Sequence, residues 1–179
     1  ACALTPRDFR VFWLLWHAKV LTTAVLARWI FPDADVATAH RRLWLLKRHG
    51  WLTQRPDRSG DCWYWTLTMK SYARLEPELP DLFQKGFETE WIDHDARVAA
   101  IHFGSLLAFP HEPFGIIGEQ WLRRVDKEFW PEPEMQQLWH RPDGYWHFPT
   151  ASGYRLVALE VERQPKKRSV YLDRFLSYE

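Results

Sequence analysis

Residues 36–49 combine a regular apolar spacing with a dense group of basic side chains. Ala39, Leu43 and Leu46 recur at three- and four-residue intervals, as expected of a helix that buries one stripe. The remaining faces carry His40, Arg41, Arg42, Lys47 and Arg48. A helix with one buried stripe and cationic groups elsewhere suits the major groove of double-stranded DNA, so we expect this segment to bind DNA.

The basic side chains divide by the part of DNA that each is expected to reach. Residues near the start of the segment would meet base edges, whereas phosphate contacts supply affinity with little sequence information. The candidates for base edges are Ala37, Thr38 and Arg41. The candidates for phosphates are Arg42, Lys47 and Arg48, with Arg55 and Arg58 from the following turn-rich segment.

The elements around this segment are expected to hold it on a small domain. Thr5, Thr22, Asp35 and Thr68 are predicted helix caps, each ahead of a helical pattern, and Gly50 is predicted to end the third helix. Residues 51–55 and 62–67 look like two strands around a turn-forming string at 56–60. Helix, helix, helix, hairpin, helix is the order of a winged helix-turn-helix domain. Two alternatives stay open: a solvated basic face on an ordinary helical domain, and a winged helix that docks on protein.

The charge distribution divides the chain into unlike parts. Residues 1–75 carry a net charge of +7, residues 76–140 carry −8 and residues 141–179 carry +2. The acidic, proline-containing string at 76–80 is the best boundary. We therefore predict a DNA-binding domain at 1–75, a linker at 76–84 and an α/β domain at 85–179.

Two short strings in the second part carry acids that could do chemistry. The first is Pro142-Asp143-Gly144, and the second is an apolar run at 156–161 that contains Glu160 and leads into Glu162. Strand alternation places Glu160 and Glu162 on the same face. The plain alternative is that Pro142-Asp143-Gly144 is only a turn, and that the two glutamates pair with nearby basic residues on a solvated face. The expected elements here are a helix at 93–107, strands at 115–125, 145–148 and 154–161, and a closing helix at 166–178.

The arrangement of Asp143 and Glu160 resembles the core of the PD-(D/E)XK nucleases. The resemblance implies an α+β protein in which a winged helix is followed by a restriction-endonuclease-like α/β domain. It implies that Asp143 and Glu160 hold Mg²⁺ and that Glu162, at the usual lysine position, joins them in catalysis. Further candidates are Lys166 and Lys167, which follow soon after, and Asp93 and Asp95 on the preceding helix. That fold normally continues with another strand after the closing helix, so a truncated version stays open.

The order of motifs along the chain resembles the replication-relaxation family of plasmids, integrated elements and phages. The matching strings are Tyr64-Trp65-Thr66-Leu67-Thr68, Asp93-His94-Asp95-Ala96-Arg97-Val98, Pro142-Asp143-Gly144 and Leu159-Glu160-Val161-Glu162-Arg163. The resemblance implies DNA binding in plasmid replication or mobilisation. We expect a DNA-binding accessory or regulatory protein with a nuclease-like second domain. The alternatives are an active Mg²⁺-dependent endonuclease, and a transcription regulator whose acidic second part binds a protein partner or forms a homodimer.

Composition narrows the remaining possibilities. The two cysteines form no spaced set, so a disulfide scaffold is not expected and a reducing, cytoplasmic location fits best. No apolar run is long enough to span a membrane, and we expect no membrane partner. A zinc site on the histidines lacks a recognisable spacing, and a structural hydrogen bond from His94 near its helix start is the preferred interpretation.

Overall fold

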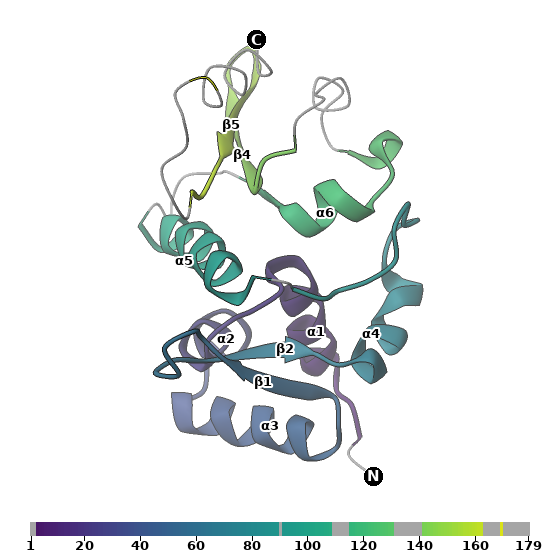
Figure 1. Ribbon diagram of the computed structural model, residues 1–179, viewed down its shortest axis with the longest axis vertical. Helices are drawn as coiled ribbons and strands as arrows, with labels where there is room; N and C mark the ends of the chain where they lie inside the picture. The colour runs from purple at the N-terminus through teal and green to yellow at the C-terminus, as the bar shows by residue number, and fades with distance from the viewer. Residues whose placement is uncertain (1–2, 90, 109–114, 131–140, 163–168, 170–179) are drawn as a thin grey trace.

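The computed structural model describes residues 3–89, 91–108, 115–130, 141–162 and 169 of the chain (Figure 1). Within these ranges the chain is a mixed α+β structure with six α-helices and two small antiparallel sheets, which confirms the predicted class. The elements in chain order are α1 (Pro6–Ala18), α2 (Thr23–Ile30), α3 (Val36–Arg48), β1 (Leu52–Pro56), β2 (Trp63–Leu67), α4 (Met69–Leu75), the short 3₁₀ helix η1 (Glu76–Glu78), α5 (Ile92–Ala108), β3 (Gly115–Gly118), α6 (Glu119–Arg124), η2 (Lys127–Phe129), β4 (Gly144–Thr150) and β5 (Gly153–Leu159).

The first four helices begin at the predicted capping residues. In each case a side-chain oxygen at the N-cap accepts a hydrogen bond from the backbone N–H three residues later, which satisfies a donor that the helix leaves unpaired. In α1 the pairing is reciprocal, because the Asp8 carboxylate also accepts from the backbone N–H of Thr5. Helix α3 ends just before Gly50, whose φ of +72° is the left-handed conformation that glycine adopts most easily.

The β1–β2 hairpin follows α3 and packs beside it. Its register pairs Leu52 with Leu67, and the carboxylate of Asp57 closes the turn by accepting from the backbone N–H groups of Gly60 and Cys62. On its other edge, β2 exchanges two backbone hydrogen bonds with Leu21, between α1 and α2. The hairpin therefore contacts α3 through β1, and β2 is hydrogen-bonded to the segment between α1 and α2.

The second sheet is a three-stranded antiparallel meander in the order β3-β4-β5. The β4–β5 register pairs Gly144, the first residue of β4, with Leu159, the last residue of β5. Asp143, just before β4, and Glu160, just after β5, therefore lie at the same end of the hairpin. In Figure 1, α5 and α6 lie between this sheet and the first four helices. The end of the sheet that carries the two acids consequently faces the middle of the molecule.

The prediction of a strand at 115–125 is wrong for most of that segment. The sequence predicts a strand at 115–125, but β3 ends at Gly118 and residues 119–124 form the helix α6. Glutamate, glutamine, leucine and arginine are good helix formers, and α6 buries Gln120 and Leu122 at two-residue spacing, which resembles strand alternation. The predicted closing helix at 166–178 falls almost wholly outside the described residues.

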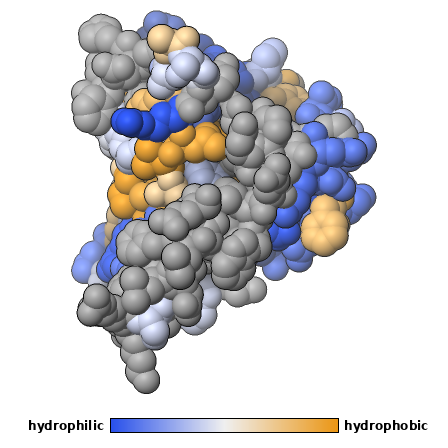
Figure 2. Space-filling view, turned by 90° about the horizontal axis from the view of Figure 1, so that it is seen from above, coloured by the Kyte–Doolittle hydropathy of each residue, from blue (hydrophilic) through white to orange (hydrophobic). Residues whose placement is uncertain are grey.

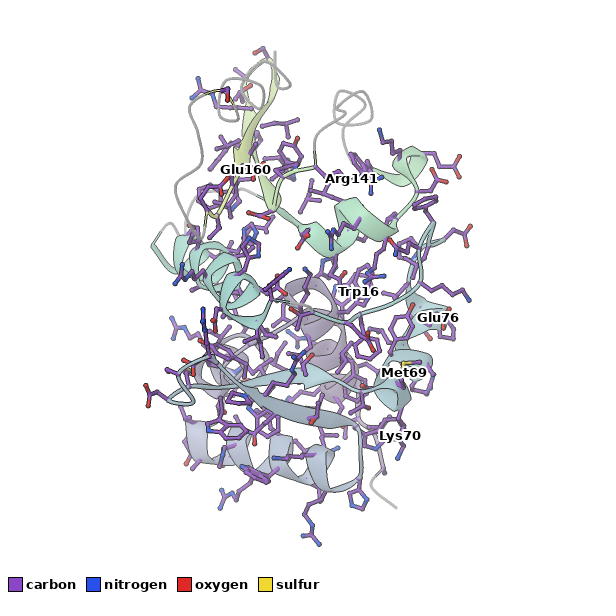
Figure 3. The ribbon with its side chains drawn as sticks, in the orientation of Figure 1. Trp16, Met69, Lys70, Glu76, Arg141 and Glu160 are labelled. Carbon is purple, nitrogen blue, oxygen red and sulfur yellow. The ribbon has the colours of Figure 1, made fainter. Side chains whose placement is uncertain are left out.

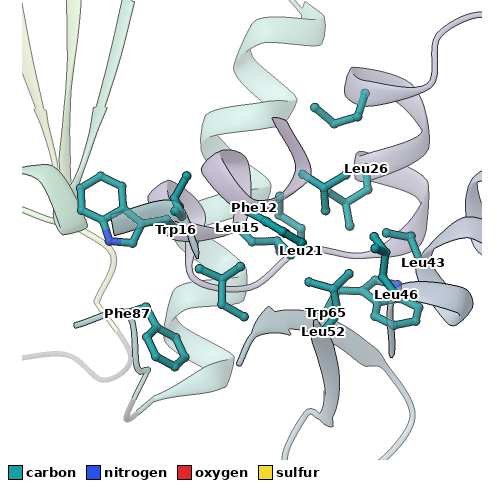
Figure 4. Packing of buried hydrophobic residues seen from close by; sticks show 14 of the residues in the cluster. Phe12, Leu15, Trp16, Leu21, Leu26, Leu43, Leu46, Leu52, Trp65 and Phe87 are labelled. Carbon is teal, nitrogen blue, oxygen red and sulfur yellow. The ribbon is translucent and has the colours of Figure 1, made fainter. Parts of the chain in front are cut away.

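The buried core runs across the predicted domain boundary. The largest cluster is centred on Phe12, Leu15 and Trp16 of α1, and it also contains Phe87 and Val125 from the second half of the chain (Figure 4). A smaller cluster joins Ile117, Leu122, Trp130 and Tyr145 under the second sheet. The first 75 residues are thus packed against the following segment through shared apolar side chains.

Figure 2 looks onto the end of the molecule that carries the second sheet, where hydrophobic residues gather in one area. The partly exposed apolar side chains of this half include Ile101 of α5 and Val157 of β5. This end differs from the outer side of α3, where the exposed residues include Arg41 and Arg48. Among the described helices, none has the length and apolar character needed to cross a membrane.

Candidate nucleic-acid interface and neighbouring cleft

Helix α3 buries the stripe that its sequence predicts. Ala39, Leu43 and Leu46 are fully buried at 0% exposure. The opposite stripe, at helical intervals of four, three and four residues, is exposed and consists of Ala37, Arg41, Trp44 and Arg48. In Figure 1, α3 lies at the end of the molecule opposite β4 and β5.

Two of the predicted base-reading residues form a pair at the start of α3. Arg41 Nη2 donates to Thr38 Oγ1 at 2.9 Å, and both side chains are exposed. The backbone N–H of Thr38 is in turn held by the carboxylate of Asp35 at 2.6 Å. Hydrogen bonds from the Thr38 side chain and from its backbone N–H lower the pKa of Asp35. The guanidinium of Arg41 is thereby oriented at the surface before any ligand is bound.

Arg42 does not share this exposed position. Its guanidinium forms a two-pronged ion pair with the Asp8 carboxylate, with Nε 2.9 Å from Oδ1 and Nη2 bonded to Oδ2. Asp8 is 0% exposed; burial alone would raise the pKa of its carboxyl, but the hydrogen bonds from Arg42 and Thr5 outweigh it and lower the pKa. The expectation that Arg42 contacts phosphate therefore competes with a structural role in joining α3 to α1.

The sequence analysis did not select Trp44, yet its ring lies on the exposed stripe of α3. Its Nε1 donates to His40 Nε2 at 2.6 Å, and Lys47 Nζ lies 4.2 Å from the ring centroid. Lys47 also donates to Gln54 on β1 at 2.8 Å. Two predicted DNA-contacting residues, His40 and Lys47, are thus committed to holding an aromatic ring in place.

Arg55 and Arg58 of the hairpin both form hydrogen bonds with the second half of the chain. Arg55 Nη1 donates to the backbone carbonyl of Thr89 at 3.0 Å, and the backbone N–H of Arg58 donates to the Asp93 carboxylate at 3.0 Å. Asp93 is consequently turned to the hairpin, and it does not join the other acids. Arg58 is an exposed residue, so its side chain stays available to contact a phosphate.

A cleft of about 1050 Å³ lies between α4, the start of α5, α6 and the ends of β4 and β5. Figure 3 shows Met69 and Glu76 on its α4 side and Glu160 at the end of β5. Its charged lining includes Lys19, His94, Asp95, Glu119, Asp143, Glu160 and Glu162. The structure therefore brings all three predicted catalytic acids, and one of the two additional acids, to a single cleft.

Lys19 enters this cleft from the end of α1. It is only 7% exposed, and its Nζ lies 3.1 Å from Asp95 Oδ1 and 2.5 Å from Glu119 Oε2. Lys19 has a φ of +62° and a ψ of −48°, and the backbone N–H of Val20 donates to the Ala18 carbonyl at 2.7 Å, so Lys19 is the central residue of a γ-turn of the rare, strained kind. The buried ion pairs fix a lysine of the first half between two acids of the second.

His94 makes a second bridge between acids. Its Nε2 lies 3.3 Å from Asp143 Oδ2 and its Nδ1 lies 3.3 Å from Asp95 Oδ1. The interactions with Asp143 and then Asp95 raise the pKa of His94 to about 10, so the ring is an imidazolium at neutral pH. The preferred sequence interpretation, a structural hydrogen bond near the helix start, fits this geometry.

The remaining contacts of Asp143 decide how well the cleft suits Mg²⁺. Its Oδ2 faces His94 and also accepts from the backbone N–H of Val161 at 2.6 Å. Burial would raise the pKa of Asp143, but these hydrogen bonds outweigh it and lower the pKa. No group of three or more His, Cys, Asp or Glu side chains among the described residues is arranged to hold a metal ion. His94 therefore already engages the Asp143 carboxylate that the expected Mg²⁺ site would use, and Mg²⁺ at Asp143 and Glu160 stays a prediction.

The other histidines follow structural roles where they are described. His102 is buried on α5, its Nδ1 accepts from Trp146 Nε1 at 2.9 Å, and burial lowers its pKa to about 4. His147 lies on β4. Lys166 and Lys167, the further candidates from the sequence, lie outside the described residues.

Comparison with known proteins finds no matching family model, no matching curated protein and no matching solved structure. A functional assignment must therefore be made from the side chains of this chain. The two features that bear on function are the exposed face of α3 with its arginines and the cleft in which Lys19 and His94 pair with acids.

Proposed function

We propose that residues 1–75 form a winged helix that binds double-stranded DNA, with α3 in the major groove and the β1–β2 hairpin as the wing. The order α1, α2, α3, β1, β2, α4 supports this, as does the pairing of β2 with Leu21. The net charge of +7 over these residues provides the electrostatic attraction that duplex binding needs.

The observation that carries the proposal is the outer face of α3. Its exposed stripe holds Arg41 and Arg48, and the Arg41–Thr38 pair is formed at the N-terminal end, where a recognition helix meets base edges. A merely solvated face would not need an arginine held by hydrogen bonds at this position. A DNA-binding role gives that arrangement a purpose.

The second half of the chain is proposed to be a nuclease-like unit that serves DNA binding as an accessory. Asp143 and Glu160 extend from the same end of adjacent antiparallel strands, which matches the placement of acids in the PD-(D/E)XK core. Lys19 pairs with Asp95 and Glu119, and His94 pairs with Asp143, so cations of the chain already engage part of the acidic lining. We therefore favour a DNA-binding accessory or regulatory protein of the kind that the replication-relaxation resemblance implies.

The test is a salt titration of binding to a duplex, followed by fluorescence anisotropy. Three or four cationic contacts predict that log K falls with log[salt] with a slope of about −3 to −4. Arg48→Ala should reduce the steepness by about one and weaken all sequences alike. Arg155→Ala, an exposed arginine on β5 at the end of the molecule opposite α3, is the matched control and should change neither quantity. A flat salt dependence, or no binding at low salt, would contradict the proposal.

An active endonuclease is the second candidate, favoured by the shared position of Asp143 and Glu160 in the cleft. Incubation with supercoiled plasmid and Mg²⁺ or Mn²⁺ tests it directly. Nicking that disappears in both Asp143→Asn and Glu160→Gln would support the enzyme. Absence of nicking by the unaltered protein, or equal nicking by Glu160→Gln, would leave the accessory role.

A further inference from the structure

We propose that Trp44 is a specificity-determining residue that recognises thymine through its 5-methyl group in the major groove. The inference rests on the proposed DNA binding by α3 and adds a base preference to it. Trp44 is 40% exposed. It lies three residues after Arg41 and four before Arg48, on the same exposed stripe.

The indole of Trp44 is held in one orientation by three neighbours. His40 accepts from its Nε1 at 2.6 Å, and Lys47 Nζ lies 4.2 Å from the ring centroid. The third neighbour is the buried ring of Trp65, which meets it at an interplanar angle of 87° with centroids 6.1 Å apart. Trp65 is itself fixed by a 2.8 Å hydrogen bond from its Nε1 to Thr23. A ring held so firmly can meet a ligand without losing further side-chain freedom.

The contacts of Trp44 also limit the chemistry that it offers. Tryptophan has a single hydrogen-bond donor, and here His40 uses it. Lys47 covers one face of the ring, which leaves less surface for stacking on an unpaired base. What remains exposed is apolar hydrocarbon, and the apolar group that a base pair presents in the major groove is the thymine methyl. The surrounding cations favour a nucleic acid over an apolar protein surface as the partner.

The experiment compares thymine with deoxyuridine, which differs only in lacking the methyl group. A duplex selected by the unaltered protein is re-made with each thymine replaced in turn, and affinity is measured by anisotropy. We expect replacement at one or two positions to weaken binding by about three- to fivefold, as for removal of one buried methyl group. Trp44→Ala should bind the thymine and deoxyuridine duplexes equally.

Three further variants separate recognition from folding and from general affinity. Trp44→Phe keeps an apolar ring and should retain part of the discrimination, which guards against a misfolded Trp44→Ala protein. His40→Ala removes the orienting acceptor and should reduce the thymine preference. Arg48→Ala is the control, since it should weaken both duplexes by the same factor.

The outcomes distinguish this inference from the function on which it rests. No binding to any duplex would overturn both. Duplex binding with equal affinity for thymine and deoxyuridine, or with a preference that Trp44→Ala retains, would overturn the role of Trp44 alone. Tighter, Trp44-dependent binding of single strands would assign the ring to base stacking and would also overturn it.

Discussion

Replacement of Arg42 by alanine is expected to destabilise the fold and to affect DNA binding only through folding. Asp8 is fully buried, and Arg42 provides its ion-pair partner. Removal of one partner from a buried pair typically costs about 3–5 kcal/mol. Asp8 keeps two hydrogen bonds from Thr5, from the backbone N–H at 2.7 Å and from Oγ1 at 2.8 Å. We therefore expect the lower end of that range, about 3 kcal/mol, a large part of the ~5–15 kcal/mol that stabilises a typical protein.

Urea unfolding followed by far-ultraviolet circular dichroism measures this loss. Arg48→Ala is the matched control on the same helix, because its side chain is exposed, and it should change the free energy of unfolding by at most about 0.5 kcal/mol. Asp8→Asn removes the charge, so Arg42→Ala should cost much less in that background. The lowered pKa of Asp8 also means that its contribution is present at neutral pH and is lost as pH falls through the folded-state pKa.

The result that would refute this reasoning is a stable Arg42→Ala protein with weakened DNA affinity. If its unfolding free energy matched that of the unaltered protein while its salt slope fell as in Arg48→Ala, Arg42 would face phosphate. The original sequence prediction for Arg42 would then be correct. Its ion pair with Asp8 would contribute little.

Two further predictions concern the cleft. Lys19→Met keeps the apolar stem but removes the ammonium that pairs with Asp95 and Glu119. Because His94 and Arg123 still pair with these two acids, the free energy of unfolding should fall by about 2–3 kcal/mol. A loss below about 0.5 kcal/mol, measured by urea unfolding, would contradict this. His94 has a folded-state pKa of about 10 against an ordinary value of 6.5, so its contribution is complete below pH 6.5 and is lost as pH rises through 10. The difference in unfolding free energy between the unaltered protein and His94→Gln should therefore shrink from pH 6 to pH 10, and a constant difference would refute the assigned charge state.

The first 75 residues were predictable because their signals are local. A capping side chain acts within three residues, and Gly50 ends α3 through its own backbone conformation. The buried stripe of α3 likewise follows from helical spacing alone. Trp44 was missed because a tryptophan is usually expected in the core, although its spacing from Arg41 places it on the outer face.

The cleft was only partly predictable because its contacts join distant parts of the chain. Asp143 and Glu160 are predicted from the resemblance to the PD-(D/E)XK core, and they lie at the same end of the β4–β5 hairpin. The pairing of Lys19 with Asp95 and Glu119 could not be predicted, because these acids lie 76 and 100 residues further along the chain. The charge of Lys19 was counted with the DNA-binding half, whereas the fold uses it to neutralise acids of the other half.

The position of α3 relative to the cleft has a consequence for how the protein could meet a long DNA molecule. In Figure 1, α3 and the second sheet lie at opposite ends of the structure, and shared core residues join the parts between them. Duplex DNA is stiff over about 150 base pairs, so a straight stretch seated on α3 would pass the cleft at a distance. Any nucleic acid that reaches Glu160 would then belong to a second segment brought in by looping or bridging. If α3 binds DNA as proposed, the shared core would hold the two sites apart by the distance between α3 and the second sheet.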